Sequence, residues 1–404
     1  MKCLCFTSEN LQVAENKVMV AFIYVPIFIL IFAYGGYVIP AWIWMQISRT
    51  TRSNPDTDLP DITMVVAAYN ESEIIEEKIR NCLRLNYPSG KLNFLFVTDG
   101  STDETPKIIQ KYPMIRLQHR TERDGKSMAI NRAMQQITSP VTIFSDANTL
   151  LNEDAVLLMA NAFKYPETGA VAGEKKVLRL RKGGANTIGE GIYWKYESKL
   201  KSFDAAFHST MGAAGELFGF RTKLYSHIPA EILLDDFVIS MNICLQGWKI
   251  AYEKEAVATE LPSANTREEK KRKSRIATGA FQTAIMLWRL ICFWEHPKLS
   301  YLYISHRLLR WVICPFLLPV ILIFSFIESQ GNNSILLAVI FYLQIVFYIA
   351  AIIGWMLDSR DRKITIFSIP FYFLFMNLNM YTGLYQFIFK HQTGVWDKAL
   401  RSKN

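Results

Sequence analysis

The sequence has few of the residues that build disulfide frameworks or clustered metal sites. Its 404 residues contain six cysteines and six histidines, which are scattered along the chain. Only Cys3 and Cys5 lie close together, and their spacing is not that of a zinc motif. A disulfide-rich fold and a structural zinc site are therefore disfavoured. The cysteines are typical of apolar side chains in a reducing compartment.

The sequence also lacks an internal repeat, a low-complexity tract and a P-loop. Lys126 opens a predicted helix, which suits a diphosphate, but the upstream glycine of a Walker motif is missing. No stacking platform or recognition motif accompanies the basic residues, so nucleic acid is not an expected partner. The net charge of +9 instead indicates membrane lipids or phosphorylated substrates.

Long apolar runs are abundant. Half of the residues are apolar and the mean hydropathy is +0.12, so part of the surface is expected to face lipid. After an N-terminal tail (1–17), the run 18–47 is too long for a signal peptide and predicts a retained transmembrane helix. Two later runs, 308–327 and 335–357, predict transmembrane helices, and a third run, 364–389, predicts a helix that is transmembrane or re-entrant. A basic tail, 390–404, follows.

The distribution of basic residues predicts the orientation in the membrane. Arg49 and Arg52 follow the first run, and a basic loop (360–363) separates the last two. Because short basic loops stay inside, we expect a multi-pass protein of the plasma (inner) membrane with its polar domain in the cytoplasm. A third full crossing at the C-terminus would place the basic tail outside, and Asn377 and Asn379 make the run 364–389 the uncertain one.

Residues 60–262 alternate short β-branched runs with helical patterns. This alternation predicts an α/β domain with a mostly parallel sheet, inserted between the transmembrane helices. The expected strands are 62–68, 92–98, 115–118 and 141–145. Residues 263–296 are predicted to form amphipathic interface helices that carry a basic motif.

Polar side chains follow three of the expected strands. Tyr69-Asn70-Glu71, Asp99 and Asp146-Ala147-Asn148 stand at these strand ends. Each alone is typical of a strand terminator or a helix cap. Because ligands bind beyond the carboxyl ends of parallel strands, their convergence on one edge favours a binding site.

Two further groups of charged residues have two interpretations each. Asp235 and Asp236 lie among apolar residues, so one of them is a candidate general base or, alternatively, a helix cap. Arg272 and Arg275 either point at phosphate groups or belong to a solvated face at the membrane. Asp146 and Asn148 could hold Mg²⁺ or Mn²⁺, although their spacing alone is a weak signal.

At this point the sequence resembles the membrane-bound family-2 glycosyltransferases of bacteria, which include exopolysaccharide, poly-N-acetylglucosamine, cellulose and hyaluronan synthases. The matching segments stand in the family's order between the membrane runs. They are VVAAYNE (65–71), VTDGSTD (97–103), RDGKSMAIN (123–131), FSDANT (144–149), GAAGELFGFR (212–221), LDDFVIS (234–240), RKSRIATGAFQ (272–282) and ISHRLLRW (304–311).

The resemblance implies a GT-A catalytic domain and a metal-dependent, inverting transfer from a nucleotide sugar, with a UDP-sugar the foremost donor. It implies donor-binding roles for Ala68, Tyr69, Glu71, Asp99, Lys126, Asp146, Arg272 and Arg275. It further implies Asp236 as the catalytic base, Asp146 and Asn148 as metal ligands, and an acceptor border at Gly215, Glu216, Leu217 and Asp235.

Two departures from the family pattern leave the product open. Asn148 stands where many relatives carry a second aspartate, and Ile276 stands where polymerising relatives carry a tryptophan. The expected function is therefore transfer to a saccharide or lipid-linked acceptor in exopolysaccharide or cell-surface glycan synthesis. The alternatives are a non-processive transferase that makes a glycolipid or a single linkage, and a non-catalytic membrane scaffold with a degenerate transferase domain.

Overall fold

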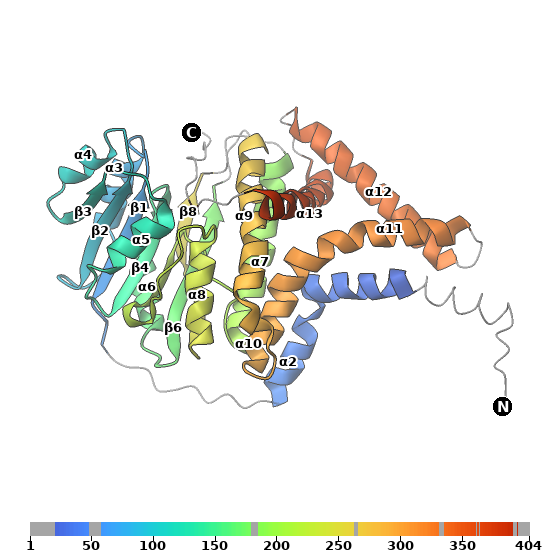
Figure 1. The fold of residues 1–404 in the computed structure, drawn as a ribbon, viewed down its shortest axis with the longest axis horizontal. Coiled ribbons are helices and arrows are strands. Elements are labelled where there is room, and N and C mark those ends of the chain that lie inside the picture. Colours follow the sequence, from blue (N-terminus) through green and yellow to red (C-terminus); the bar gives the residue numbers. More distant parts are fainter. Residues whose placement is uncertain are drawn as a thin grey trace.

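A computed structural model describes residues 21–47, 58–178, 185–261, 266–330, 335–360, 362, 364–390 and 394. An α/β domain lies at one end of the molecule and a set of apolar helices projects from the other (Figure 1). Helices α7 (Ala185–Phe207) and α9 (Thr266–Met286) stand between the two parts. The predicted N-terminal tail (1–17) and all of the basic tail except Lys390 and Gly394 lie outside the described residues.

The α/β domain is built on one eight-stranded sheet with the order β3-β2-β1-β4-β7-β6-β8-β5. Strands β1 to β4 are all parallel neighbours and match the four predicted strands, whereas β7 and β5 each pair antiparallel. The strands are β1 (Ile62–Ala68), β2 (Leu92–Asp99), β3 (Ile115–Arg120), β4 (Val141–Asp146), β5 (Thr149–Leu151), β6 (Thr168–Val177), β7 (Phe218–Arg221) and β8 (Lys249–Glu260). The mixed, mostly parallel sheet confirms the predicted fold class.

Helices cover both faces of the sheet because the central strands are apolar on both sides. Along β1, Val65 belongs to one buried cluster while Met64 and Val66 belong to the other. The flanking helices are α3 (Ile75–Leu83), α4 (Thr105–Gln110), α5 (Lys126–Met134), α6 (Ala155–Ala162) and α8 (Asp235–Leu245).

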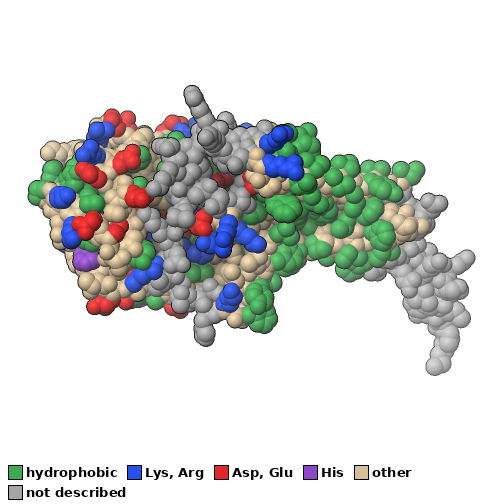
Figure 2. Space-filling view, turned by 90° about the horizontal axis from the view of Figure 1, so that it is seen from above, with side chains coloured by type: hydrophobic (Ala, Val, Ile, Leu, Met, Phe, Trp, Pro, Cys, Tyr) green, Lys and Arg blue, Asp and Glu red, His purple; other side chains and the backbone are tan. Residues whose placement is uncertain are grey.

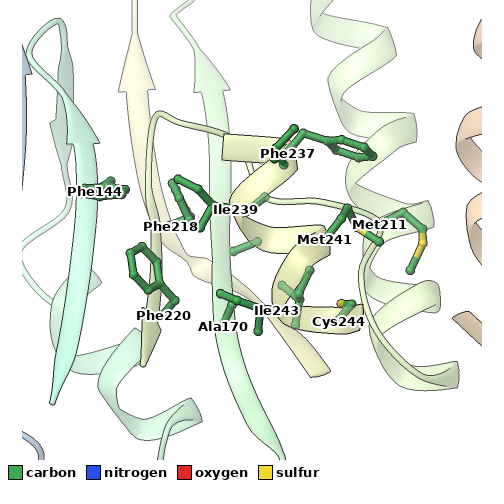
Figure 3. Packing of buried hydrophobic residues seen from close by; sticks show 14 of the residues in the cluster. Phe144, Ala170, Met211, Phe218, Phe220, Phe237, Ile239, Met241, Ile243 and Cys244 are labelled. Carbon is green, nitrogen blue, oxygen red and sulfur yellow. The ribbon is translucent and has the colours of Figure 1, made fainter. Parts of the chain in front are cut away.

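Aromatic side chains join the sheet to α8. Phe144 of β4 packs against both Phe218 and Phe220 of β7, with its ring centroid 5.3 Å from each of theirs. Figure 3 shows these rings facing Ile239 and Ile243 of α8. This packing fixes the start of α8, where Asp235 and Asp236 lie, against the sheet.

Among the described residues, two helices are long and apolar enough to cross a membrane, and a bent pair could add a third. The two are Pro297–Gln330, which comprises α10 (Pro297–Leu302), the π-helix η4 (Tyr303–Ile313) and α11 (Cys314–Gln330), and α12 (Ile335–Asp358). Apolar side chains cover this projecting part of the surface (Figure 2). The predicted spans 308–327 and 335–357 fall within these helices.

The first apolar run is not one straight helix. Ala21–Gly36 and Val38–Ile47, the latter containing α2, meet at an angle of 56°. Gly35 has φ +154°, a backbone conformation that side chains with a Cβ rarely adopt. The transmembrane helix predicted over 18–47 is thus bent where the structure describes it, and the two parts form either a broken span or a re-entrant loop.

The last apolar run forms α13 (Thr365–Phe389), which is not among the candidate spans. It packs along α9, where a Cβ on Gly383 would come within 2.5 Å of the Ala277 Cβ. Gln386 also accepts hydrogen bonds from Ser274 and Thr278 of α9. Gln386 of α13 is thus used in packing against α9, whereas Asn377 and Asn379 donate to backbone oxygens of their own helix.

Candidate active site

The carboxyl ends of β1, β2 and β4 meet on one rim of the sheet, as the strand pattern predicts. In the strand register, Ala68 lies beside Thr98, and Ala67 lies beside Asp146. The loops that follow these strands are tied together. Thr102 donates a backbone hydrogen bond to Asn70 Oδ1 (2.8 Å), and Glu71 donates one to Thr105 Oγ1 (2.9 Å). The rim is therefore a single rigid edge.

Asp99 holds the loop that leads into α5. Its Oδ2 accepts hydrogen bonds from the backbone N–H groups of Asp124 (2.9 Å) and Gly125 (2.7 Å), and its Oδ1 pairs with Arg132 (2.8 Å). The carboxylate is 6% exposed. In this structure Asp99 thus positions the backbone next to Lys126, and contact with a nucleotide remains a prediction.

The same loop carries an aromatic and a guanidinium group to the rim. Arg123 lies 3.8 Å above the centre of the Tyr69 ring. Gly100, with φ +67°, permits this approach, because a Cβ there would lie 2.5 Å from the Arg123 Cβ. Tyr69 and Glu71 are half-buried beside this pair, whereas Ala68 is buried within the sheet.

Lys126 lies among three carboxylates. Its Nζ is 2.9 Å from Asp146 Oδ1 and 3.9 Å from Asp235 Oδ2. Burial lowers the pKa of Lys126, but Asp146, Asp235 and Asp236 outweigh it, so that the pKa is raised above its ordinary value. The lysine is thus a fixed positive charge at this rim.

Asp236 lies at the start of α8 and contacts Gly215, which is 21 residues away in the sequence. Its Oδ2 accepts a hydrogen bond from the Gly215 N–H (2.6 Å), and its Oδ1 accepts one from the Phe237 N–H (2.8 Å). Burial and the charge of Asp235 raise the pKa of Asp236 to about 7. This pKa suits a general base working near neutral pH.

Gly215 is the point where these groups meet. A Cβ on this residue would lie 3.3 Å from Asp236 Oδ2, 3.3 Å from Lys126 Nζ and 3.8 Å from Asp146 Oδ1. The missing side chain leaves a small hollow that Lys126, Asp146 and Asp235 line together. Asp235 Oδ2 is buried there without a hydrogen-bond partner among the described residues.

The two residues after Gly215 point in different directions. Glu216 pairs with Lys175 of β6, and although burial opposes ionisation, this lysine lowers the pKa of Glu216 to about 2. Leu217 is 2% exposed and packs in the core under the sheet. The side chain of Leu217 therefore belongs to the core, and an acceptor border at Gly215, Glu216, Leu217 and Asp235 stays a prediction.

The structure separates the two arginines of the basic motif. Arg272 is enclosed by Glu190 (2.5 Å), Glu269 (3.0 Å) and Glu260 (3.2 Å). Arg275 instead donates to the backbone oxygen of Leu233 (3.1 Å). Burial lowers the pKa of Arg275, while the charges of Asp235, Asp236 and Asp146 oppose this. Arg275 thus contacts the segment that leads into Asp235, whereas Arg272 does not.

Two lysines that the sequence analysis did not single out support the rim. Lys78 of α3 is fully buried and donates to Ser145 Oγ (2.7 Å) and to the backbone oxygen of Thr149 (2.8 Å), on either side of the Asp146 turn. Lys175 joins Glu216 to Glu260. The burial of Lys78 could have been predicted from the sequence, because this lysine lies on the apolar face of α3 with Ile75, Ile79 and Cys82.

No cluster of three or more histidine, cysteine or acidic side chains in the described part of the chain is arranged to hold a metal ion. Asp146 and the half-buried Asn148 nevertheless supply two oxygen donors on one turn. This donor set fits a hard cation such as Mg²⁺ or Mn²⁺ whose other ligands are phosphate and water. The residues present therefore fit a metal that binds together with a diphosphate.

Residues 63–228 match the profile of glycosyl transferase family 2. Residues 63–228 thus carry the domain of this family. The match covers the rim from β1 through Gly215 and confirms the resemblance that the motifs suggested. The α/β domain is accordingly that of a nucleotide-sugar glycosyltransferase.

The curated relatives include poly-β-1,6-N-acetyl-D-glucosamine synthase of Staphylococcus aureus, 25% identical over 280 residues. They also include β-monoglucosyldiacylglycerol synthase of Nostoc sp., 27% identical over 255 residues. The matches cover 65% and 58% of this chain, and 65% and 52% of the respective relatives. The chain thus matches about two thirds or less of each relative's length.

Among solved structures, the fold is similar to that of a mannosyltransferase from Pyrobaculum calidifontis, solved in complex with GDP-Man and Mn²⁺. The TM-score is 0.65 at 22% identity, and the match covers 91% of this chain and 99% of that one. Because the match extends well beyond the α/β domain, the similarity in fold includes the helices outside the sheet.

Proposed function

We propose that this protein is an inverting glycosyltransferase that transfers a sugar from a nucleotide-diphosphate donor to a hydroxyl group of a saccharide or lipid-linked acceptor. The observation that carries the proposal is the hollow at Gly215, where Asp236, Lys126 and Asp146 meet. A base with a pKa of about 7 lies there beside fixed positive charge. These are the groups needed to deprotonate an alcohol and to stabilise a leaving diphosphate.

The donor is proposed to lie along the rim, with its base beside Ala68, Tyr69 and Asp99 and its diphosphate towards Lys126 and Arg275. A bound Mg²⁺ or Mn²⁺, held by Asp146 and Asn148, would neutralise charge on the diphosphate. Arg272 is proposed to act indirectly, because its ion pairs with Glu190 and Glu260 hold α9 against the sheet and α7.

Transfer is proposed to occur in one displacement. Asp236 takes the proton of the acceptor hydroxyl, whose oxygen attacks the anomeric carbon as the bond to the diphosphate oxygen breaks. The nucleoside diphosphate leaves, and the configuration at the anomeric carbon inverts because attack and departure occur on opposite faces. Asp235, which lines the hollow, and Glu216, which follows Gly215, are proposed to border the acceptor.

The apolar helices are proposed to hold the catalytic domain at the cytoplasmic face of a membrane. Two candidate spans and a bent pair support membrane attachment. Arg360 and Arg362 lie between α12 and α13, which favours a cytoplasmic position for that end of α12. Cysteine accessibility on either side of the membrane tests this, and labelling of position 360 from the outside would contradict it.

The experiment that tests the activity is a donor screen with purified protein, UDP-N-acetylglucosamine, UDP-glucose and GDP-mannose, with and without a chelator. We expect one donor to release nucleoside diphosphate in a metal-dependent reaction. Release from none of them would contradict the proposal and revive the interpretation as a non-catalytic scaffold.

The relative that makes a glucosyl diacylglycerol favours a second candidate, a single transfer to a lipid acceptor. The departure at Ile276 points in the same direction, since polymerising relatives have tryptophan there. Size analysis of the labelled product distinguishes the two. A ladder of oligosaccharides indicates a polymer synthase, whereas one lipid-soluble product indicates a single transfer.

A further inference from the structure

Helix α7 turns charged side chains, as well as apolar ones such as Leu200 and Phe207, towards the interior. Glu190, Glu197, Lys201 and Asp204 recur at helical spacing, and each is at most 3% exposed. We call these four residues the α7 charged face. Burying a charge is costly unless it is paired, so the partner of each of the four is informative.

Three of the four charges have partners on other elements. Glu190 pairs with an arginine of α9, while Glu197 and Asp204 pair with residues of η4 and of the break in the first helix. The partners are Arg272 for Glu190 (2.5 Å), Arg307 (2.7 Å), His306 (3.0 Å) and Arg310 (3.1 Å) for Glu197, and Tyr37 (3.0 Å) and His306 for Asp204.

Lys201 differs from the other three. Its amino group has neither a hydrogen-bond acceptor nor an ion-pair partner among the residues that the structure describes. It lies instead over two aromatic rings, 5.7 Å from the centre of Trp194 and 5.8 Å from that of Tyr252. Burial lowers the pKa of Lys201, which is the expected response of an ammonium group that lacks a partner.

This part of α7 adjoins the acceptor side of the hollow. Lys175, which pairs with Glu216, also lies 5.0 Å from the centre of the half-buried Trp194 ring. Glu216 follows Gly215, the residue that binds Asp236. A short chain of contacts therefore leads from the proposed base to Trp194 and Lys201.

We propose that Lys201, Trp194 and Tyr252 form a subsite for a neutral saccharide unit of the acceptor, beyond the unit whose hydroxyl reacts. This rests on the proposed function. An indole ring can cover the apolar face of a sugar, and an ammonium group can donate to its hydroxyl oxygens. Glu197, Glu174 and Glu216 favour the charged form of Lys201 and Arg307 opposes it, so charges of both signs surround the lysine and a neutral ligand suits the site.

The test is Lys201→Met in the full-length protein, which removes the charge at similar volume. Rates are measured with the donor that the wild type turns over and with N-acetylglucosamine as a monosaccharide and as β-1,6-linked oligosaccharides of two to four units. We expect KM for the oligosaccharides to rise about tenfold, as for the loss of a hydrogen bond to a charged group. The monosaccharide rate and acceptor-independent donor hydrolysis should stay unchanged.

Lys199→Met is the matched control, because Lys199 is exposed on the same helix. It should leave every rate at the wild-type value. Trp194→Phe keeps a ring with a smaller face and should raise the oligosaccharide KM by a smaller factor than Lys201→Met. It also keeps the inference testable if the lysine variant fails to fold.

An unchanged oligosaccharide KM in folded Lys201→Met would overturn the subsite and leave the proposed function intact. A wild type that glycosylates diacylglycerol but no oligosaccharide would overturn it as well. Absence of turnover by the wild type with every donor would instead contradict the proposed function itself, so the two failures are distinguishable.

Discussion

The catalytic rim and the three paired acids of the α7 charged face, Glu190, Glu197 and Asp204, use buried charge in opposite ways. At the rim, Asp236 has a raised pKa and Asp235 keeps a buried oxygen without a hydrogen-bond partner among the described residues. On α7, Glu197 is bonded to two arginines and a histidine. Incompletely satisfied charge is available for chemistry, whereas fully paired charge holds elements together.

The difference has a structural consequence. The partners of the α7 charged face come from η4, α9 and the broken first helix, so this face connects the apolar helices to the catalytic domain. Arg307 of η4 also donates to the backbone oxygen of Met211 (2.9 Å), four residues before Gly215. Changes at the rim should therefore affect turnover, and changes to the paired acids Glu190, Glu197 and Asp204 should affect folding first.

The largest effect is expected for Asp236→Asn. Loss of a general base lowers turnover by about 10²- to 10⁴-fold. Donor binding should remain close to wild type, because Lys126 and Arg275 are unchanged. Transfer rates and donor affinity measured on the same preparation check this, and near-normal transfer with normal donor binding would contradict the assignment of Asp236.

Glu197→Gln should affect stability rather than chemistry. Removing one partner of a buried ion pair leaves charges uncompensated and typically costs about 3–5 kcal/mol. We expect a markedly lower unfolding temperature in detergent. The matched control is Glu76→Gln, whose carboxylate forms an exposed pair with Arg80, and it should leave the unfolding temperature unchanged. Equal unfolding temperatures for the two variants would contradict the claim that the paired charges of α7 stabilise the fold.

The pH dependence of turnover should reflect the protonation of Asp236 at the rim. Because the pKa of Asp236 is raised to about 7, the base is protonated at lower pH and kcat/KM should fall about tenfold per pH unit below this value. A profile that stays flat from pH 8 to pH 5 would show that another group is the base.

The same shift predicts a small dependence of stability on pH. The folded protein keeps a proton on Asp236 up to about pH 7, whereas an unfolded aspartate loses it near pH ~4. Folding therefore takes up a proton between these values, and stability falls as pH rises through this window. Unfolding temperatures of wild type and Asp236→Asn should show a steeper decline for the wild type, and identical slopes would contradict the shifted pKa.

Much of the fold could be predicted from local patterns. The four expected strands end within two residues of β1 to β4, because each is a short apolar run followed by turn residues. The convergence of Asp99 and Asp146 on one rim follows from parallel strand order alone. Single-residue details such as Leu217 could not be predicted, since a residue beside a site can belong to either the site or the core.

The sequence by itself determined the α/β class, the order of the motifs and the residues at the ends of the strands, because these depend on near neighbours in the chain. Tertiary structure alone decided the partners of the buried charges. Arg272 and Arg275 are only three residues apart and lie on neighbouring positions of one helix face, yet one pairs with Glu190 and the other donates to the backbone of Leu233, because the elements packed on either side of α9 differ. Lys201 likewise is an ordinary helical lysine until α7, β8 and the Gly215 loop are brought together, because pairing across the fold depends on which elements pack against one another.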